Sequence, residues 1–465
     1  MSQIPVSKRF QKIIDKCTSG GGDKSCVFVP TVVLHNADDE YSLTVDLVTR
    51  FWIRQNFMEK YTDVMFIELE IPYAQYQEYA KHVNNLRCTI KLEYYNTKTQ
   101  SRIFDIDRDD IIFKDLVVIA NEENLNQRYS AGMMGTSSSG GPADTPAKRQ
   151  ARIKVPLYLM ESCVFRTRHT QVNGIMNGVT VEQMMRWVVS QLSIEKVNIA
   201  PPDNKQVYSN FIVPPSSDIK NIFPYIQNKC GVYYDGIGWY VTGDTCYIYP
   251  QFATSTKRTA VRGTIHIAHC PDGEYKGFSC YHVEDGEDTY ILSNTTLERT
   301  SLNTKSMDKT GTVHLVGVAD GRHDDSVVIG KDGSVKRHAS NIQTIDSVAN
   351  NQPLGDAQVA RFDGYSNNVY EATSQMSASN GVVMKLGWNM AILQRIKPGQ
   401  EVLFHYDDKD STYTVKRGRV MSADFDSQLA KLADGTHFGM QFICTLSLFL
   451  EPDTITNDAD TTMGG

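Results

Sequence analysis

Long apolar runs are absent from this sequence of 465 residues. Residues 1–17 lack the apolar core of a secretion signal. The longest apolar stretch near the end, Phe442 to Leu450, is far shorter than the roughly 20 residues with which a helix crosses a bilayer. We therefore expect no signal peptide and no membrane insertion.

An excess of positive charge is absent as well. The sequence has 47 Lys and Arg against 54 Asp and Glu, which gives a formal net charge of -7. A general nucleic-acid binder shows a basic face and a high isoelectric point, so the composition argues against this class. Mild acidity is instead suited to the wall of a channel, because it repels the DNA backbone and lets DNA slide through.

The cysteines do not form the pattern of a disulfide framework. Their number, nine, is odd, and they are scattered along the chain. Without a secretion signal, this pattern favours reduced thiols in a protein made in the cytoplasm. The nine are Cys17, Cys26, Cys88, Cys163, Cys230, Cys246, Cys270, Cys280 and Cys444.

Catalytic motifs are also missing. The sequence contains no G-x-S-x-G, H-E-x-x-H or phosphate-loop motif. Acid and base side chains do gather in residues 284–288 and 321–325, but both stretches are polar and rich in turn residues, as solvated loops are. We predict no catalytic site and no cofactor. A cell-wall hydrolase that uses His323 or Asp324 is an alternative interpretation.

One stretch, residues 266–282, contains several possible zinc ligands. Their spacing fits no zinc-finger pattern, and the alternation of a strand places His266 and Cys270 on one face and His269 on the other. The pattern favours a β-hairpin with buried cysteines, so we predict no metal site. The possible ligands are His266, His269, Cys270, Cys280 and His282.

The length suggests about three domains of roughly 150 residues each. From residue 26 to residue 120, apolar and polar residues mostly alternate with a period of two, which predicts half-buried antiparallel strands. Pro72–Val83 has helix-like composition, and Ile111–Ile119 reads as a further strand. The alternating apolar residues are Tyr41, Leu43, Val45, Leu47, Ile67, Leu69, Ile71, Cys88, Ile90, Leu92 and Tyr94.

Residues 153–250 predict a central domain with helices and a small meander. Thr180 and Gln183 form a capping box before an amphipathic helix. A second helix is capped by Ser216, Ser217 or Asp218 and stops at Gly231, and Pro224 either kinks it or begins its regular part. Three short aromatic strands follow, at residues 232–234, 239–241 and 247–249.

The remaining segments complete the predicted organisation. Residues 1–25 form a docking helix or arm that packs on its own domain or on a neighbouring subunit, and residues 121–152 have the composition of a flexible linker or loop. Residues 251–453 are again β-rich, with strands at 401–406, 413–423 and 442–450 and an insertion at about 271–380. Residues 454–465 form a frayed tail.

Five stretches of the central segment resemble the baseplate hub proteins of contractile-tailed bacteriophages. The resemblance implies a mainly β protein with small α+β parts, in which two tube-like β-barrel domains, here 26–120 and 251–453, flank a helix-plus-meander domain. A faint repeat between Asn85–Tyr94 and Pro398–Tyr406 agrees with two related barrels. The five stretches are Asn177–Glu182, Pro201–Asn204, Ile212–Pro215, Cys230–Tyr234 and Tyr247–Pro250.

The resemblance also implies a function without enzymatic activity. A hub is a homotrimer that joins the sixfold tail tube to the threefold central spike, contacts baseplate wedge proteins and forms part of the DNA channel of the virion. A carbohydrate-binding tail fibre protein is a further alternative. The residues that we expect to serve structure or interfaces are Thr180, Gly231, Tyr233, Trp239, Tyr247 and Pro250, with Glu68 and Glu70 as carboxylates facing the lumen or solvent.

Overall fold

A computed structural model describes most of the chain. The described residues are 8–18, 26–36, 41–45, 47–82, 86–96, 111–119, 152–168, 170–192, 194–253, 260–270, 282–285, 287–293, 298–301, 312–318, 325–329, 335–339, 357–363, 370, 374, 377–378, 381–393, 396–407, 413–431 and 438–451. Strands dominate, which confirms the predicted mainly β class. No helix in these ranges is long and apolar enough to cross a membrane.

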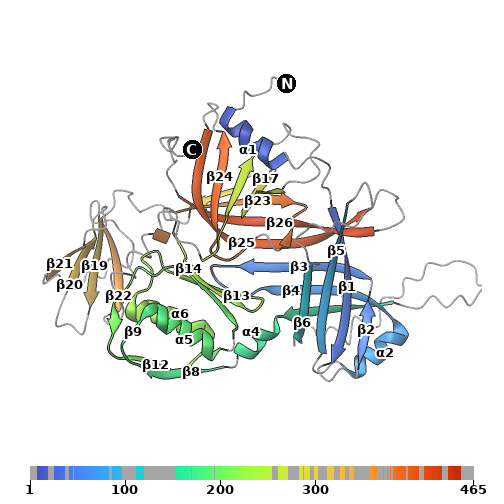
Figure 1. The fold of residues 1–465 in the computed structure, drawn as a ribbon, viewed down its shortest axis with the longest axis horizontal. Coiled ribbons are helices and arrows are strands. Elements are labelled where there is room, and N and C mark those ends of the chain that lie inside the picture. Colours follow the sequence, from blue (N-terminus) through green and yellow to red (C-terminus); the bar gives the residue numbers. More distant parts are fainter. Residues whose placement is uncertain are drawn as a thin grey trace, which may run out of the picture.

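A 15-stranded sheet is the largest element, and part of it closes into a ring (Figure 1). The strands of the ring are β1 (Cys26–Asn36), β3 (Val48–Asn56), β4 (Val64–Pro72), β5 (Leu86–Asn96), β6 (Ile111–Ile119), β7 (Arg152–Met160), β25 (Tyr413–Lys431) and β26 (Phe438–Leu450). Pairing runs from β25 through β3, β4, β7, β6, β5 and β1 to β26, and β26 pairs with β25 again. We call these strands the ring.

The period-two pattern of the sequence decides which side chains fill the ring. Ile67, Leu69 and Ile71 of β4 are fully buried and belong to the main core, whereas Glu68 and Glu70 between them face outward. Leu47 breaks the predicted alternation and is 40% exposed. The reason is that β2 (Ser42–Val45), which pairs with β1, ends before it, and the next strand begins with buried Val48.

Strands from both halves of the chain build this sheet. β25 pairs with β3 through Ser422–Asp426 and with β24 through Tyr413–Arg419, so one long strand serves two groups of neighbours. The second group contains β15 (Thr264–His269), β16 (His282–Asp285), β17 (Asp288–Ser293), β18 (Glu298–Ser301), β23 (Val382–Asn389) and β24 (Glu401–Asp407). It extends from β25 through β24, β15, β17 and β16, and from β26 through β23 and β18.

This topology bears on the predicted domains. The strands of residues 26–120 close their ring only with β7, β25 and β26. β7 begins at Arg152, where we expected the linker to end and the central domain to begin, but it pairs with β4 and β6. Alternation tells which face of a strand is buried and says nothing of which distant strand lies beside it. The domain boundaries themselves remain a prediction.

The central unit, residues 170–250, packs its helices on small sheets. Two of its helices, α5 (Val181–Gln191) and α6 (Ile219–Cys230), lie side by side in Figure 1. A third short helix, α4 (Ser162–Thr167), joins β7 to this unit. The strands are β8 (Val172–Met176), β9 (Val179–Thr180), β10 (Lys196–Ile199), β11 (Val207–Tyr208), β12 (Phe211–Ser217), β13 (Ile237–Thr242) and β14 (Thr245–Pro250).

The predicted aromatic meander is wrong in one strand. β13 and β14 form the expected hairpin, but the third strand of this sheet is β10, which pairs parallel to β14. Residues 232–234 form no strand, because the Gln227 side chain accepts hydrogen bonds from the Val232 and Tyr233 amides and the Val232 carbonyl accepts from residues 203 and 204. These polar groups are satisfied without a strand partner.

The α6 helix resolves the question about Pro224. Asp218 is the N-cap, since its Oδ1 accepts from the Asn221 amide at 3.0 Å, and the helix runs without a break from Ile219 to Cys230. Pro224 therefore lies inside the helix, and the alternative in which the regular helix begins there is wrong. Its ring is on the exposed face.

A separate four-stranded sheet lies within the predicted insertion. Its order is β21-β20-β19-β22, with strands β19 (Thr312–Val318), β20 (Asp325–Ile329), β21 (Val335–Ala339) and β22 (Ala357–Asp363). β16, β17 and β18 also lie within the predicted insertion, but they belong to the 15-stranded sheet. The predicted flexible segment before Arg152 and the frayed tail lie outside the described residues.

The remaining helices cover sheet faces. α2 (Tyr73–Lys81) confirms the helix predicted between strands β4 and β5. α1 (Lys8–Thr18) packs on β15, β16, β17 and β24 through buried Phe10, Ile14 and Cys17. α1 therefore packs on its own chain, which is one of the two predicted partners. It lies on the second strand group and not on the ring (Figure 1).

Candidate functional site

The contact between the ring and the central unit contains a group of buried polar side chains. Asp63, only 4% exposed, lies just before β4. Its Oδ1 accepts hydrogen bonds from the Tyr240 hydroxyl at 2.7 Å and from Gln55 Nε2 at 3.0 Å, and its Oδ2 accepts from Thr242 Oγ1 at 3.0 Å. We call these residues, with Glu161, the polar junction.

Two buried carboxyl groups shape the electrostatics of the polar junction. Burial raises the pKa of Asp63, and the hydrogen bonds from Tyr240, Gln55 and Thr242 oppose that rise. Burial and the charge of Asp63 raise the pKa of Glu161 well above its usual value. Glu161 therefore favours its protonated form, because two negative charges in one buried site repel each other.

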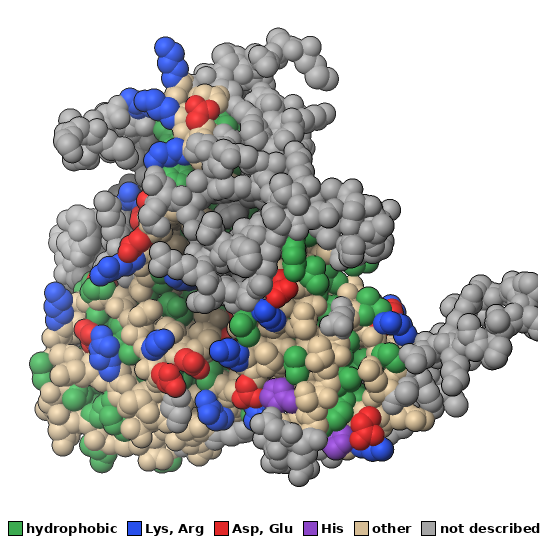
Figure 2. All heavy atoms as spheres, turned by 45° about the vertical axis from the view of Figure 1, so that its right-hand side comes forward, with side chains coloured by type: hydrophobic (Ala, Val, Ile, Leu, Met, Phe, Trp, Pro, Cys, Tyr) green, Lys and Arg blue, Asp and Glu red, His purple; other side chains and the backbone are tan. Residues whose placement is uncertain are grey.

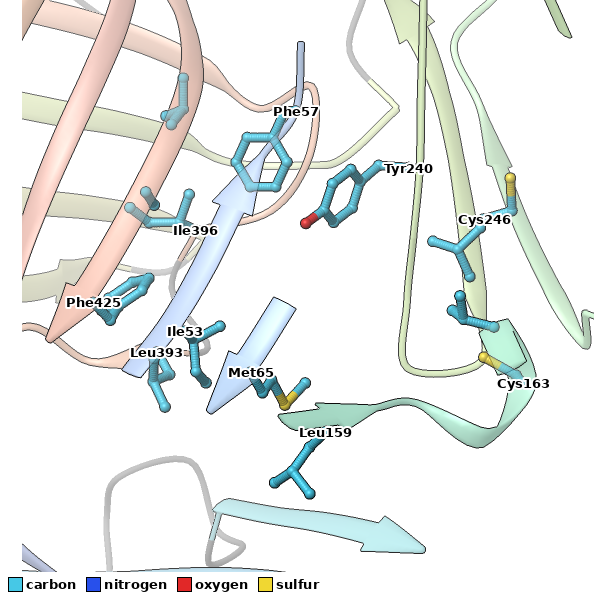
Figure 3. Packing of buried hydrophobic residues seen from close by; sticks show 14 of the residues in the cluster. Ile53, Phe57, Met65, Leu159, Cys163, Tyr240, Cys246, Leu393, Ile396 and Phe425 are labelled. Carbon is cyan, nitrogen blue, oxygen red and sulfur yellow. The ribbon is translucent and has the colours of Figure 1, made fainter. Parts of the chain in front are cut away.

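Backbone and aromatic contacts strengthen this connection. The Val241 amide donates to the Tyr61 carbonyl at 2.8 Å, and the Tyr249 hydroxyl donates to the Phe57 carbonyl at 3.0 Å. The rings of Phe57 and Tyr240 meet edge to face with 4.8 Å between their centroids. Figure 3 shows the two side chains next to each other. The ring and the central unit thus share hydrogen bonds and one hydrophobic core.

Sequence reasoning missed the polar junction. Asp63 and Tyr240 are 177 positions apart, and neither belongs to a motif. Tyr249, which contacts Phe57, follows the predicted residue Tyr247 by two positions, which places both tyrosines on the same face of β14, yet only Tyr249 is fully buried. The alternation of the strand therefore could not indicate which of the two tyrosines contacts the ring.

Thr180 performs the capping role that the sequence predicted. Its side chain accepts from the Gln183 amide at 3.4 Å, and the Gln183 Oε1 accepts from the Thr180 amide at 2.9 Å. Both bonds of a capping box are therefore present at the start of α5. Met184, Met185, Val188 and Val189 form the buried face of this amphipathic helix.

Gly231 and Tyr233 hold the turn that follows α6. Gly231 has φ 72° and ψ 126°, and its amide donates to the Gln227 carbonyl at 2.8 Å. Its positive φ confirms the predicted glycine stop. The hydroxyl of fully buried Tyr233 donates to the Ala200 carbonyl at 2.5 Å, which ties the turn to the end of β10.

The other predicted residues of the central unit lie on the hairpin. Trp239 stacks on Tyr61 at 5.3 Å between centroids and also contacts Phe223. Tyr247 is half-buried on β14, and Pro250 ends that strand opposite Ile237. These residues have packing partners, and their interface role remains a prediction.

Glu68 and Glu70 lie on the outer face of the ring, away from the other predicted residues. Glu68 Oε1 accepts from Thr49 Oγ1 at 2.6 Å and forms an ion pair with Lys154 at 3.2 Å. Burial would raise the pKa of Glu68, but the bonds from Thr49 and Lys154 and the charges of Lys154 and Arg50 leave it lowered. Whether this face lines a channel remains a prediction.

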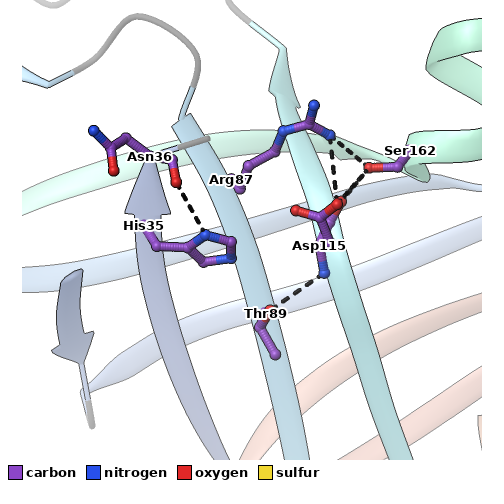
Figure 4. A network of polar contacts seen from close by, with 6 residues as sticks. All are labelled: His35, Asn36, Arg87, Thr89, Asp115 and Ser162. Carbon is purple, nitrogen blue, oxygen red and sulfur yellow. Dashed lines mark hydrogen bonds and ion pairs between the residues drawn. The ribbon is translucent and has the colours of Figure 1, made fainter. Parts of the chain in front are cut away.

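A second polar network joins β5, β6 and α4 (Figure 4). Ser162 Oγ accepts from Arg87 Nη1 at 2.5 Å and donates to the Asp115 carbonyl, and the Asp115 amide donates to Thr89 Oγ1 at 3.2 Å. The nearby His35 ring contacts the carbonyl of Asn36 at 3.3 Å and not Ser162. The serine is therefore not arranged as a nucleophile with a histidine base. His323 and Asp324 lie outside the described residues.

A row of four aromatic rings lies beneath α1. His266 stacks on Tyr290 and on His405, and His405 stacks on Tyr413. His266 Nδ1 and His405 Nε2 are 3.0 Å apart, and His405 Nδ1 is 2.7 Å from the Tyr413 hydroxyl. Burial, and then the neighbouring His266, lower the pKa of His405 to about 3.

This histidine pair does not by itself make a metal centre. Among the residues that the structure describes, no group of three or more His, Cys, Asp or Glu side chains could hold a metal ion. Cys270 is buried in the cluster with α1, whereas Cys280 and the His282 side chain are outside the described set. The cysteines with described side chains are all buried: Cys17, Cys88, Cys163, Cys230, Cys246, Cys270 and Cys444.

Acidification is expected to weaken the fold beneath α1. His405 has a pKa of about 3 in the folded chain and near 6.5 when unfolded. Its contribution to stability is complete above pH 6.5 and is lost as the pH falls toward 3, since only the unfolded chain binds the proton in this range. Between pH 7 and pH 5 the loss is about 2 kcal/mol, measurable by urea unfolding at the two pH values.

A variant separates His405 from the other titrating groups. His405→Gln keeps a donor and an acceptor toward His266 and Tyr413 but cannot gain a charge. Its free energy of unfolding should change less between pH 7 and pH 5 than that of the parent chain. Equal pH dependence in both chains would show that His405 is not the group responsible.

Comparison with known proteins gives one family and several similar structures. A sequence profile of the family described as Bacteriophage PBS1 gene 109 protein matches residues 29–268. No curated protein matches the chain. The tail protein from Neisseria meningitidis MC58 has a similar structure, with 10% sequence identity and a TM-score of 0.44; the similarity covers 90% of this chain and 96% of that chain. The prophage MuSo2 43 kDa tail protein from Shewanella oneidensis has 9% identity and a TM-score of 0.42, with 90% of this chain and 97% of that chain covered. A chain of the lidded Francisella PdpA-VgrG complex has 8% identity and a TM-score of 0.44, with 97% of this chain and 57% of that chain covered.

Proposed function

Because the chain belongs to the Bacteriophage PBS1 gene 109 protein family, we propose that it is a structural protein of a phage tail baseplate, without enzymatic activity. The family match over residues 29–268 is the observation that carries this proposal. It extends from β1 to β15 and so includes the whole central unit, where the residues similar to hub proteins lie. The place of action is then the tail of the virion.

Within the baseplate, we assign the chain the role of the hub. Three copies would join the sixfold tail tube to the threefold spike and contact the surrounding wedge proteins. The sharing of β25 and β26 by two strand groups supports this role, because a trimer would present each group three times. Three chains with two tube-like units each would present six similar units to the sixfold tail tube and still have the threefold symmetry of the spike.

The proposed trimer encloses part of the DNA channel. The formal net charge of -7 supports passage of DNA without binding. Glu68 and Glu70 face outward from the ring, and we assign that face to the channel wall or to solvent.

The solution mass tests the hub assignment. Light scattering of the full chain, alone and with the candidate spike protein, should give three times the chain mass of 52.3 kDa, either directly or once the spike is added. A persistent monomer that ignores the spike would contradict the hub. Peptidoglycan hydrolysis, tested with Asp324→Ala, and host glycan binding would then be the functions to assay.

A further inference from the structure

A pocket of about 570 Å³ opens where the ring meets the central unit. The turn Phe57–Tyr61 between β3 and β4 forms one wall, α6 forms a second, and the start of β13 forms the third. The volume is within the range of sites that hold a small ligand or several residues of a peptide. None of the proposed hub contacts accounts for this pocket.

The walls of the pocket are fixed before anything binds. The Val241 amide donates to the Tyr61 carbonyl, and Gln251 Nε2 donates to the Met58 carbonyl at 3.1 Å. Trp239 stacks on Tyr61, so the turn is held to β13 by both backbone and side chain. Binding to a fixed pocket does not require the entropic cost of ordering the pocket residues.

Positive charge predominates at the rim. Lys60 and Lys220 are both exposed, and among the described residues neither forms an ion pair. The Lys220 ammonium lies 5.8 Å from the centroid of the Tyr61 ring. The acid of the rim, Glu59, accepts from Asn56 Nδ2 at 3.3 Å. A ligand with carboxylates therefore fits the charge of this rim.

Pro224 removes the helical hydrogen-bond donor of one carbonyl of α6. In a helix, the carbonyl of Lys220 would accept from the amide of residue 224. Proline has no N–H, so this carbonyl lacks its helical donor, and both residues line the pocket. A backbone amide of a peptide supplies a donor of the right kind, whereas the phosphate backbone of a nucleic acid has none.

We propose that this pocket docks an acidic peptide segment of a partner protein in the tail. Lys60 and Lys220 bind its carboxylates, and the Lys220 carbonyl accepts one of its backbone amides. The source of the partner rests on the proposed function. Because the pocket is lined by both the ring and the central unit, a bound segment contacts both and braces them against each other.

Site-specific photo-crosslinking in infected cells tests the proposal. The full chain carries p-benzoylphenylalanine in place of Asn228, an exposed residue of the pocket, or in place of Ser209, an exposed residue outside it. Mass spectrometry then maps the crosslinked peptide. We expect position 228, and not position 209, to capture a segment of another protein that contains at least two Asp or Glu.

Charge variants make the test specific. Lys60→Glu with Lys220→Glu should reduce the crosslink about tenfold, while the same two positions changed to Arg should retain it. Lys196→Glu with Lys205→Glu, exposed lysines outside the pocket, is the matched control. Crosslinks to a neutral or basic segment, to nucleic acid or to this chain itself would overturn the proposal. So would a crosslink yield at position 228 that is no higher than the yield at position 209, or an equal loss of crosslinking in the control variant. Presence of the chain in purified particles is scored separately and tests the proposed function alone.

Discussion

Replacing Asp63 with alanine is expected to lower the free energy of unfolding by about 4 kcal/mol. The substitution leaves the buried Tyr240 hydroxyl and the Gln55 amide without the acceptor that they share. A buried donor left unpaired costs about 1–3 kcal/mol, and Thr242 loses a partner as well. A urea titration monitored by tryptophan fluorescence measures the change in the free energy of unfolding.

Asparagine at position 63 is the matched control. Asp63→Asn keeps the shape and one carbonyl acceptor for Tyr240 or Gln55, and its amide can donate to Thr242. We expect it to cost about 1–2 kcal/mol, clearly less than alanine. If Asp63→Ala unfolds at the same urea concentration as the parent chain, the polar junction does not hold the ring to the central unit.

Replacing Gly231 with alanine is expected to cost about 3 kcal/mol. Gly231 has φ 72° and ψ 126°, a conformation that L-residues rarely adopt. An added Cβ would also collide with the ring of Tyr370. The turn that presents Val232 and Tyr233 to Gln227 would then have to shift, and the same urea titration reports the loss.

Gly243 allows the two causes to be separated. It has φ 57°, but a Cβ there would meet nothing within 4 Å. Gly243→Ala should therefore cost only the backbone penalty of about 1–2 kcal/mol. Equal losses at the two positions would mean that the contact with Tyr370 contributes nothing.

Local chemistry made much of the fold predictable. The capping box of Thr180 and Gln183, the positive φ of Gly231 and the buried face of β4 depend on neighbours within a few residues, and each is as expected. The failed strand at residues 232–234 shows the limit. Its aromatic residues favour a strand, but the Gln227 side chain of the preceding helix accepts the hydrogen bonds of the Val232 and Tyr233 amides.

Long-range pairing was beyond the sequence. No periodicity says that β3 lies beside β25, or that Asp63 meets Tyr240. The resemblance indicated the right mainly β class, but it could not show that the two groups of strands share β25 and β26. Six of the eight predicted residues lie in the central unit and two lie on β4, but they form no single site, since each was chosen for its local role.

The sharing of β25 and β26 has a consequence for the order of events during synthesis. The ring strands up to Met160 leave the ribosome long before Tyr413 is added, and ribosomes add roughly 5–20 residues per second. Throughout that interval, roughly 10–50 s, β3 lacks the neighbour with which it pairs in the finished ring. An unpaired strand edge invites pairing with other chains. Nascent chains on one message are therefore most prone to aggregate, and most dependent on chaperones, before the last two strands arrive.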